Sequence, residues 1–136
     1  MLYKKFKLYV AGASKEIDMI EMYIKQLEES HINITHNWCK VIRSKVDRVL
    51  SNEELIECAL EDLRGVDVAD GLWLMIPGST SIGCYVELGY AIAIKRQIII
   101  SGKIFPNNIF CMDKRFHRFE THKQALDYIC FNYGQA

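Results

Sequence analysis

The stretch that most constrains the fold is residues 68–101, with the sequence VADGLWLMIPGSTSIGCYVELGYAIAIKRQIIIS. Its two short apolar runs, residues 72–76 and 97–101, predict buried strands, and residues 84–95 between them predict a helix. Two buried strands joined through a helix are typical of a parallel sheet. Glu87, in the first turns of that helix, would then lie near the carboxyl ends of the strands, where open α/β proteins bind ligands.

The rest of the chain continues this alternation of strands and helices. Further strands are predicted at residues 6–12, 32–38 and 109–112, and further helices at residues 15–30, 52–65 and 121–132. Residues 39–50 remain ambiguous, because charges interrupt their helical spacing.

Two helix starts carry capping signals. Ser14 can cap the first helix, and Ser51 with Glu54 has the spacing of a capping box. Because right-handed crossovers leave few topologies, the pattern predicts an α/β, flavodoxin-like three-layer fold with a five-stranded parallel sheet in the order 2-1-3-4-5. No repeat or linker is visible, so residues 1–136 are predicted to form a single domain.

Composition excludes several function classes. The chain has 17 Lys and Arg against 17 Asp and Glu, so no net field favours nucleic acid or a membrane surface as a partner. No apolar run reaches membrane-spanning length, and residues 8–12 are too few for a signal-peptide core. Five scattered cysteines predict reduced thiols and a cytoplasmic protein. The four histidines lack metal-ligand spacing, so we expect no metal and no cofactor.

The predicted topology brings several polar segments to one edge of the sheet. These are residues 12–14 after the first strand, residues 77–83 after the third, and the start of the helix that carries Glu87. His36 and Trp38 lie at the rim, and Asp62 reaches this edge only if the backbone turns favourably. Each has an ordinary structural explanation as well: a charge at a helix end, a solvated helix residue, or edge packing.

Three motifs together are more informative than any single residue. They are LYVAG near the start, E-D-L-x-x-x-x-x-A-D before the third strand, and S-x-G-x-x-x-E-L-G-Y-A after it. This set resembles the nucleoside 2-deoxyribosyltransferase superfamily, which includes the 2'-deoxynucleoside 5'-phosphate N-hydrolases. The resemblance runs from about Leu8 to Cys130 and is concentrated in residues 62–91. It implies cleavage of the N-glycosidic bond of a nucleoside or nucleoside 5'-monophosphate, by hydrolysis or base transfer.

The resemblance also implies roles for individual residues. Glu87 matches the nucleophile that attacks the anomeric carbon. Asp62 matches the aspartate that holds the sugar hydroxyls or the base and helps protonate the leaving base. The helix N-terminus is expected to keep Glu87 ionised. The other candidate substrate-binding residues are Tyr9, Gly12, Ser14, Lys15, His36, Trp38, Ser79, Ser81 and Gly83.

Two further expectations concern the substrate and the assembly. The phosphate-specific members have an arginine shortly after the first glycine, whereas this chain offers only Lys15, which lacks the bidentate fork. A 5'-phosphate on the substrate therefore stays an open question. Members of the superfamily commonly complete the pocket from a neighbouring subunit, so a homodimer or higher homo-oligomer is expected, with Asn107 or Asn108 as the contributed residue.

Other functions remain open at this stage. The segment S-I-G-C-Y-V-E-L also looks like the pattern of Toll/interleukin-1 receptor (TIR) domains, some of which cleave NAD with a glutamate on a comparable helix. A non-catalytic domain that binds a nucleotide or signalling molecule is a third possibility. Flavin binding is weaker, because residues 12–15 lack the Ser/Thr run of a flavin phosphate cradle.

Overall fold

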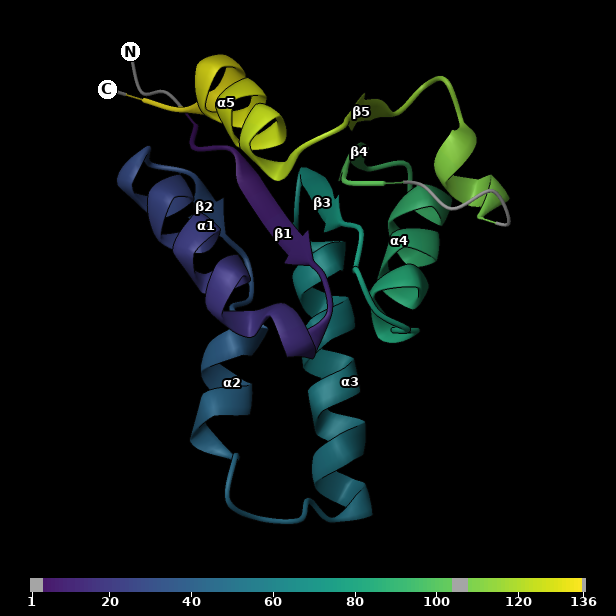
Figure 1. Cartoon of the computed structure of the whole chain (residues 1–136). Helices are drawn as coiled ribbons and strands as arrows, with labels where there is room; N and C mark the ends of the chain where they lie inside the picture. The colour runs from purple at the N-terminus through teal and green to yellow at the C-terminus, as the bar shows by residue number, and fades with distance from the viewer. Residues whose placement is uncertain (1–3, 104–107, 136) are drawn as a thin grey trace.

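The computed structural model describes residues 4–103 and 108–135 (Figure 1). It contains a five-stranded parallel sheet in the order β2-β1-β3-β4-β5, with helices on both faces, which confirms the predicted fold class and strand order. The strands are β1 (Lys7–Ala11), β2 (Asn33–Ile34), β3 (Gly71–Met75), β4 (Gln97–Ser101) and β5 (His117–Phe119). The helices are α1 (Ile17–Glu29), α2 (Trp38–Ser44), α3 (Asn52–Asp67), α4 (Gly83–Ala93) and α5 (His122–Tyr133), with short 3-10 turns η1 (Ser14–Glu16) and η2 (Ile109–Met112).

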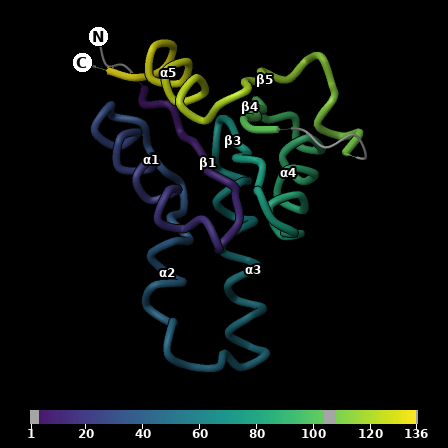
Figure 2. Tube along the Cα trace, in the orientation of Figure 1, coloured from purple at the N-terminus to yellow at the C-terminus, as the bar shows by residue number. Residues whose placement is uncertain are grey.

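The helices form two groups around the sheet. α1 contacts α5, and α3 contacts α4. Both α3 and α4 also contact β1, so a side chain of β1 that faces them lies between two helices. Figures 1 and 2 show α2 and α3 projecting beyond the arrowhead end of β1. This arrangement leaves β1, α3 and α4 as the elements that position a candidate site.

The central strands form the core because they are apolar on both faces. All five residues of β3 are buried, as are four of the five residues in each of β1 and β4. Strands covered on both faces are expected to be continuously apolar, as these are. The capping box predicted at Ser51 and Glu54 is present and starts α3. In the described part of the chain, no helix is both long and apolar enough to cross a membrane.

The second predicted strand, residues 32–38, is wrong in its length. Only Asn33 and Ile34 pair with β1, and Trp38 already belongs to α2. The reason is a helix cap: the Asn37 side chain accepts hydrogen bonds from the N–H groups of Cys39 and Lys40. A capped turn stops the strand and begins the helix.

The fifth strand was also predicted at the wrong place. Residues 109–112 form the turn η2, and the strand beside β4 is His117–Phe119. This edge strand is short and mostly exposed, so it carries no apolar run for the sequence pattern to detect. The predicted cap of the first helix is wrong as well, because Ser14 lies inside η1 and no side chain caps either η1 or α1.

Candidate active site

Glu87 lies in the second turn of α4 and is bound by a tyrosine of β1. The hydroxyl of Tyr9 donates a hydrogen bond of 2.5 Å to Oε2 of Glu87. Burial raises the pKa of Glu87 to about 7, and the charge of Asp62 acts in the same direction, whereas the Tyr9 hydrogen bond lowers it. Burial therefore outweighs the stabilisation of the charged form, and near neutral pH this carboxyl gains and loses its proton readily.

This result corrects the expectation that the helix N-terminus keeps Glu87 ionised. The first turn of α4 contains no acidic residue, and Glu87 is five positions into the helix. The effect of a helix dipole falls off within one turn, so it does not offset the loss of water around a buried carboxylate.

Tyr9 is a buried donor. Its side chain is fully inaccessible to solvent, and burial followed by the charges of Glu87 and Asp62 raises the pKa of its hydroxyl. The hydroxyl therefore keeps its proton and continues to donate to Glu87 over the whole working pH range. The structure thus shows Tyr9 bonded to Glu87, and the substrate contact indicated by the sequence stays a prediction.

Asp62 is paired with a histidine. Oδ1 of Asp62, on α3, lies 3.2 Å from Nε2 of His36, which follows β2. Both side chains remain partly exposed, Asp62 at 32% and His36 at 20%. Burial raises the pKa of Asp62, and the neighbouring His36 lowers it. Asp62 is thus reachable from solvent and has a partner of its own.

The two carboxyl groups are linked through their charges and through the packing of their partners. The charge of Asp62 acts on both Glu87 and Tyr9. The partners of the two acids also pack against one position of α3, because a Cβ at Gly65 would lie 2.7 Å from Cβ of His36 and 3.0 Å from a ring carbon of Tyr9. Their surroundings differ: a neutral hydroxyl holds Glu87, and an imidazole holds Asp62. Two acids with different partners can take different roles, one as nucleophile and one as proton donor.

The loop from residue 77 to residue 82 leads from β3 into α4. The hydroxyl of Ser79 is buried, and it has no hydrogen-bond partner in the described part of the chain. Ser81 lies near Cys84, with 3.9 Å between Oγ and Sγ, and Gly83 is exposed at the first position of α4. Glu16 accepts a hydrogen bond from the N–H of Gly78 and so ties η1 to this loop.

The candidates after β1 divide into a packing residue and two exposed residues. A Cβ at Gly12 would lie 2.7 Å from Cδ1 of Ile20, so this glycine allows α1 to approach the sheet. Ser14 and Lys15 are exposed on η1. The close contact at Gly12 supports a packing role for this glycine. Lys15 stays a candidate for binding an anionic group of the substrate.

Trp38 has the surroundings of a core residue. Trp38 is only 8% exposed, and its indole N–H donates to the backbone oxygen of Val10, so its contacts are those of a core residue. Asn107 lies outside the described residues. Asn108 is half-buried and directly precedes η2.

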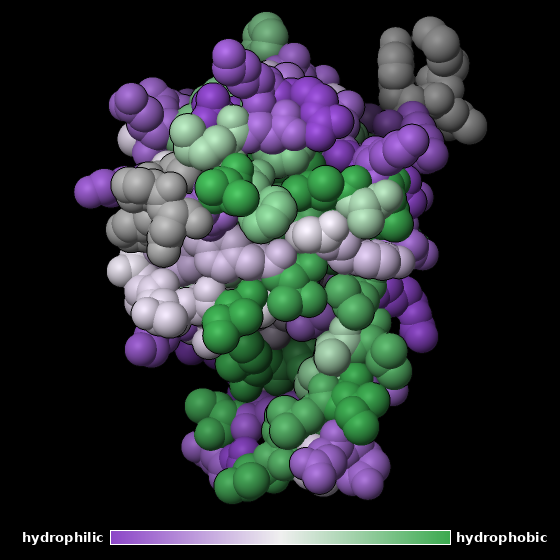
Figure 3. Space-filling view, turned by 90° about the vertical axis from the view of Figure 1, so that its right-hand side faces the viewer, coloured by the Kyte–Doolittle hydropathy of each residue, from purple (hydrophilic) through white to green (hydrophobic). Residues whose placement is uncertain are grey.

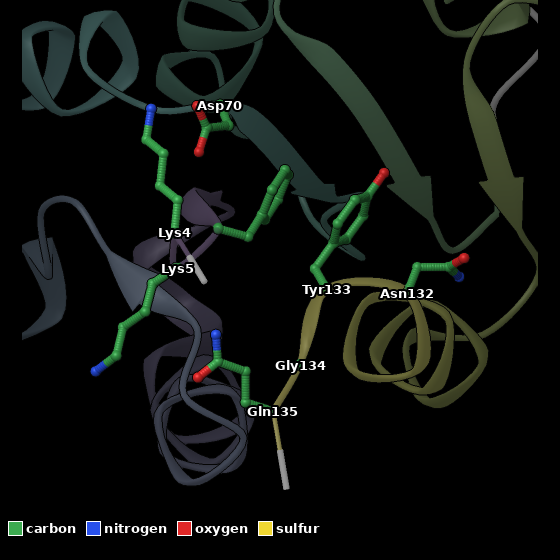
Figure 4. Close-up of a pocket in the computed structure, with 8 residues that line it drawn as sticks. Lys4, Lys5, Asp70, Asn132, Tyr133, Gly134 and Gln135 are labelled. Atoms are coloured by element: carbon green, nitrogen blue, oxygen red, sulfur yellow. The ribbon is translucent and has the colours of Figure 1, made fainter. Parts of the chain in front are cut away.

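A separate hollow of about 570 Å³ opens beside the residues that precede β1 and β3, at the amino ends of the strands (Figure 4). Its lining includes Lys4 and the stacked rings of Phe6 and Tyr133, whose centroids are 3.9 Å apart. The carboxylate of Asp70 accepts the backbone N–H of Lys7 and so stabilises the beginning of β1. Glu87 and Asp62 do not line this hollow.

Sequence reasoning singled out both acidic residues but missed Gly65, which packs against their partners His36 and Tyr9. The helix was predicted to end near this glycine, whereas α3 continues to Asp67. A glycine inside a helix costs about 1 kcal/mol relative to alanine, so its presence there is a signal that close packing is needed.

The arrangement is that of an open α/β protein with a five-stranded parallel sheet. No family model matches the chain, and no curated protein matches it in sequence. The structure is similar to that of a Clostridium botulinum CMP N-glycosidase, BcmB, with a TM-score of 0.56 and 15% sequence identity. The match covers 90% of this chain and 94% of that chain, and it shows a shared fold over nearly the whole length.

Proposed function

We propose that this protein cleaves the N-glycosidic bond of a nucleoside or nucleoside 5'-monophosphate, with Glu87 as the nucleophile. The proposal rests on two acid pairs, Glu87 with Tyr9 and Asp62 with His36. Tyr9 and His36 both pack against Gly65, which supports a common site. The shared fold with a CMP N-glycosidase supports it. The three sequence motifs support it independently.

The chemistry follows from the charge that develops as the bond breaks. An oxygen of Glu87 bonds to the anomeric carbon while the carbon–nitrogen bond breaks, and the base leaves with the bonding electron pair. Asp62 supplies a proton or a hydrogen bond to that base. Water then attacks the anomeric carbon of the glycosyl–enzyme and gives a proton to the deprotonated Asp62, while the bond to Glu87 breaks and the sugar is released. In transfer, a second base attacks the same carbon and takes the sugar.

The loop before α4 is proposed to hold the sugar or its 5' substituent. The unpartnered hydroxyl of Ser79, with Ser81 and Gly83, can bind sugar or phosphate oxygens there. Lys15, exposed on the neighbouring η1, is the proposed charge for a 5'-phosphate. Because lysine acts on phosphate as a point charge, we expect a 5'-phosphate to improve KM more than kcat.

The test is release of free base by the wild-type protein. Ribo- and deoxyribonucleosides, their 5'-monophosphates and NAD are incubated with it, and free base is measured by reverse-phase chromatography. We expect base release from nucleosides or monophosphates, with kcat/KM falling below about pH 7 as Glu87 becomes protonated. A second free base in the mixture separates transfer from hydrolysis.

Three results contradict this proposal, and two of them point elsewhere. Release of nicotinamide from NAD alone indicates the glycohydrolase alternative. Thermal stabilisation by a nucleotide without any base release indicates a binding domain. If no compound releases base or stabilises the protein, the proposed nucleotide site is wrong.

We also propose that a second copy of the chain covers the outer face of α3 and α4. Figure 3 shows hydrophobic side chains gathered on this face. Exposed apolar side chains there come from α3, η2, α4 and the N-cap residue of α4: Leu55, Ile56, Leu60, Ile82, Val86, Ile109, Phe110 and Met112. Patches of this kind mark interaction surfaces, and the net charge of zero opposes self-association little.

Replacing Val86 by glutamate is expected to convert a dimer into a monomer, because it places a charge in the apolar face. Val86 is 57% exposed on α4. The mass in solution, measured by light scattering after gel filtration, checks this. Phe131→Glu is the matched control, since Phe131 is an exposed apolar residue on α5. A wild-type protein that runs as a monomer contradicts the proposal.

The free cysteines support a cytoplasmic location for the proposed enzyme. All five cysteines are free, and Cys39, Cys84 and Cys111 are buried. Free thiols of this kind are typical of proteins in reducing compartments.

A further inference from the structure

Gly65, on α3, is packed so closely that any side chain would collide with its surroundings. It is buried, and a Cβ built on it would lie 2.7 Å from Cβ of His36. The same Cβ would lie 3.0 Å and 3.1 Å from two ring carbons of Tyr9. The Cβ of His36 is attached directly to the backbone, so it cannot swing away as the end of a flexible side chain can.

The two residues that contact Gly65 are the partners of the two acidic groups. Tyr9 donates to Glu87, and His36 pairs with Asp62. A third contact holds the backbone in place, because the hydroxyl of Thr35 donates a 2.6 Å hydrogen bond to the carbonyl oxygen of Gly65. The segment after β2 is thereby fixed against α3, next to His36.

We propose that Gly65 is a positioning residue that sets the placement of both acidic groups, by allowing His36 and Tyr9 to rest against one backbone position. A side chain at this position moves His36 away from Asp62 and turns the Tyr9 hydroxyl away from Glu87. The effect on catalysis rests on the proposed function of the site. The effect on the Tyr9–Glu87 and His36–Asp62 pairs is independent of that function.

Substitution by alanine separates this role from ordinary helix stability. Alanine is favoured over glycine by about 1 kcal/mol at an interior helix position, so without the contacts Gly65→Ala would strengthen α3. Gly89 provides a matched control. It lies inside α4, and a Cβ there would meet nothing within 4 Å. Gly89→Ala therefore makes the same chemical change without touching either pair.

The experiment measures the titration of the carboxyl groups by NMR in protein labelled with ¹³C at glutamate and aspartate. In Gly65→Ala we expect the pKa of Glu87 to rise above its value of about 7, since the Tyr9 hydrogen bond that lowers it is lost. The pKa of Asp62 is expected to rise too, because His36 lowers it in the wild type. Gly89→Ala is expected to leave both unchanged.

Activity provides a second readout. For a displaced nucleophile we expect kcat/KM for base release to fall about 10- to 100-fold in Gly65→Ala, with the acidic limb of the pH profile moved to higher pH. If Gly65→Ala folds and the pKa values of Glu87 and Asp62 are the same as in wild type, the inference is overturned. If wild type releases no base but both pKa values rise in Gly65→Ala, the proposed function fails and the positioning role stands.

A milder variant covers the case in which Gly65→Ala does not fold. Thr35→Val keeps the volume of the side chain but removes the hydroxyl that holds the carbonyl of Gly65. We expect it to raise the pKa of Asp62, through the neighbouring His36, and to leave Glu87 close to its wild-type value. If Gly65→Ala is unfolded and Thr35→Val shifts neither group, the inference is overturned.

Discussion

Replacement of Glu87 by glutamine is expected to lower kcat/KM for base release by roughly 10³- to 10⁶-fold, the range found when an enzyme loses its nucleophile. Glutamine has nearly the same shape, and its side-chain oxygen can still accept the Tyr9 hydrogen bond. The expected loss therefore comes from the missing charge at the anomeric carbon. Initial rates measured by chromatography of the free base check it, and full activity in the variant would remove Glu87 from the mechanism.

The same variant is expected to be more stable than wild type at pH 8. The folded-state pKa of Glu87, about 7, lies above the ordinary glutamate value of 4.5, so the folded protein holds this proton more tightly than the unfolded chain does. Stability is therefore lost as pH rises from about 4.5 to 7, and the loss persists above pH 7. Glutamine avoids this cost, which we place at roughly 1–3 kcal/mol.

Urea unfolding at pH 8 and at pH 4.5 measures this difference, which we expect to shrink toward zero at the lower pH. Glu53→Gln, at an exposed position in the first turn of α3, is the matched control and is not expected to be stabilised at pH 8. A variant that is less stable than wild type at pH 8 would show that Glu87 serves the fold. Lower activity together with higher stability is the pattern expected of an active-site charge.

The fold could be predicted from the sequence because the central strands are recognisable as short apolar runs. β3 and β4 are covered on both faces and therefore read as uninterrupted apolar runs. The edge strands give no such signal, because β2 has two residues and β5 is mostly exposed. Their place in the sheet depends on long-range pairing, which leaves no local pattern.

The acidic residues of the site could be selected from the sequence, but their protonation could not. Glu87 and Tyr9 are separated by 78 positions in the chain, and only the packing of α4 over β1 brings the hydroxyl to the carboxylate. The expectation of an ionised Glu87 considered the helix end alone. Burial, which dominates its pKa, is a property of the tertiary structure.

The role of the second acid is open to an equally direct test. Asp62→Asn is expected to lower kcat/KM by about 10²- to 10⁴-fold, the usual contribution of a general acid. Asparagine cannot supply a proton, so the loss should be greatest for bases that leave poorly without one. For nucleosides of electron-poor bases, which leave as anions more readily, the loss should be clearly smaller.

A series of nucleosides with increasingly good leaving bases measures this dependence in wild type and in the variant. Glu57→Gln, on the exposed part of α3, is the control and is expected to behave as wild type. An equal loss for every base would assign Asp62 to holding the sugar and would leave proton transfer to another group. The partial exposure of Asp62 and its pairing with His36 favour the steeper dependence, because a proton can reach this carboxyl from solvent between turnovers.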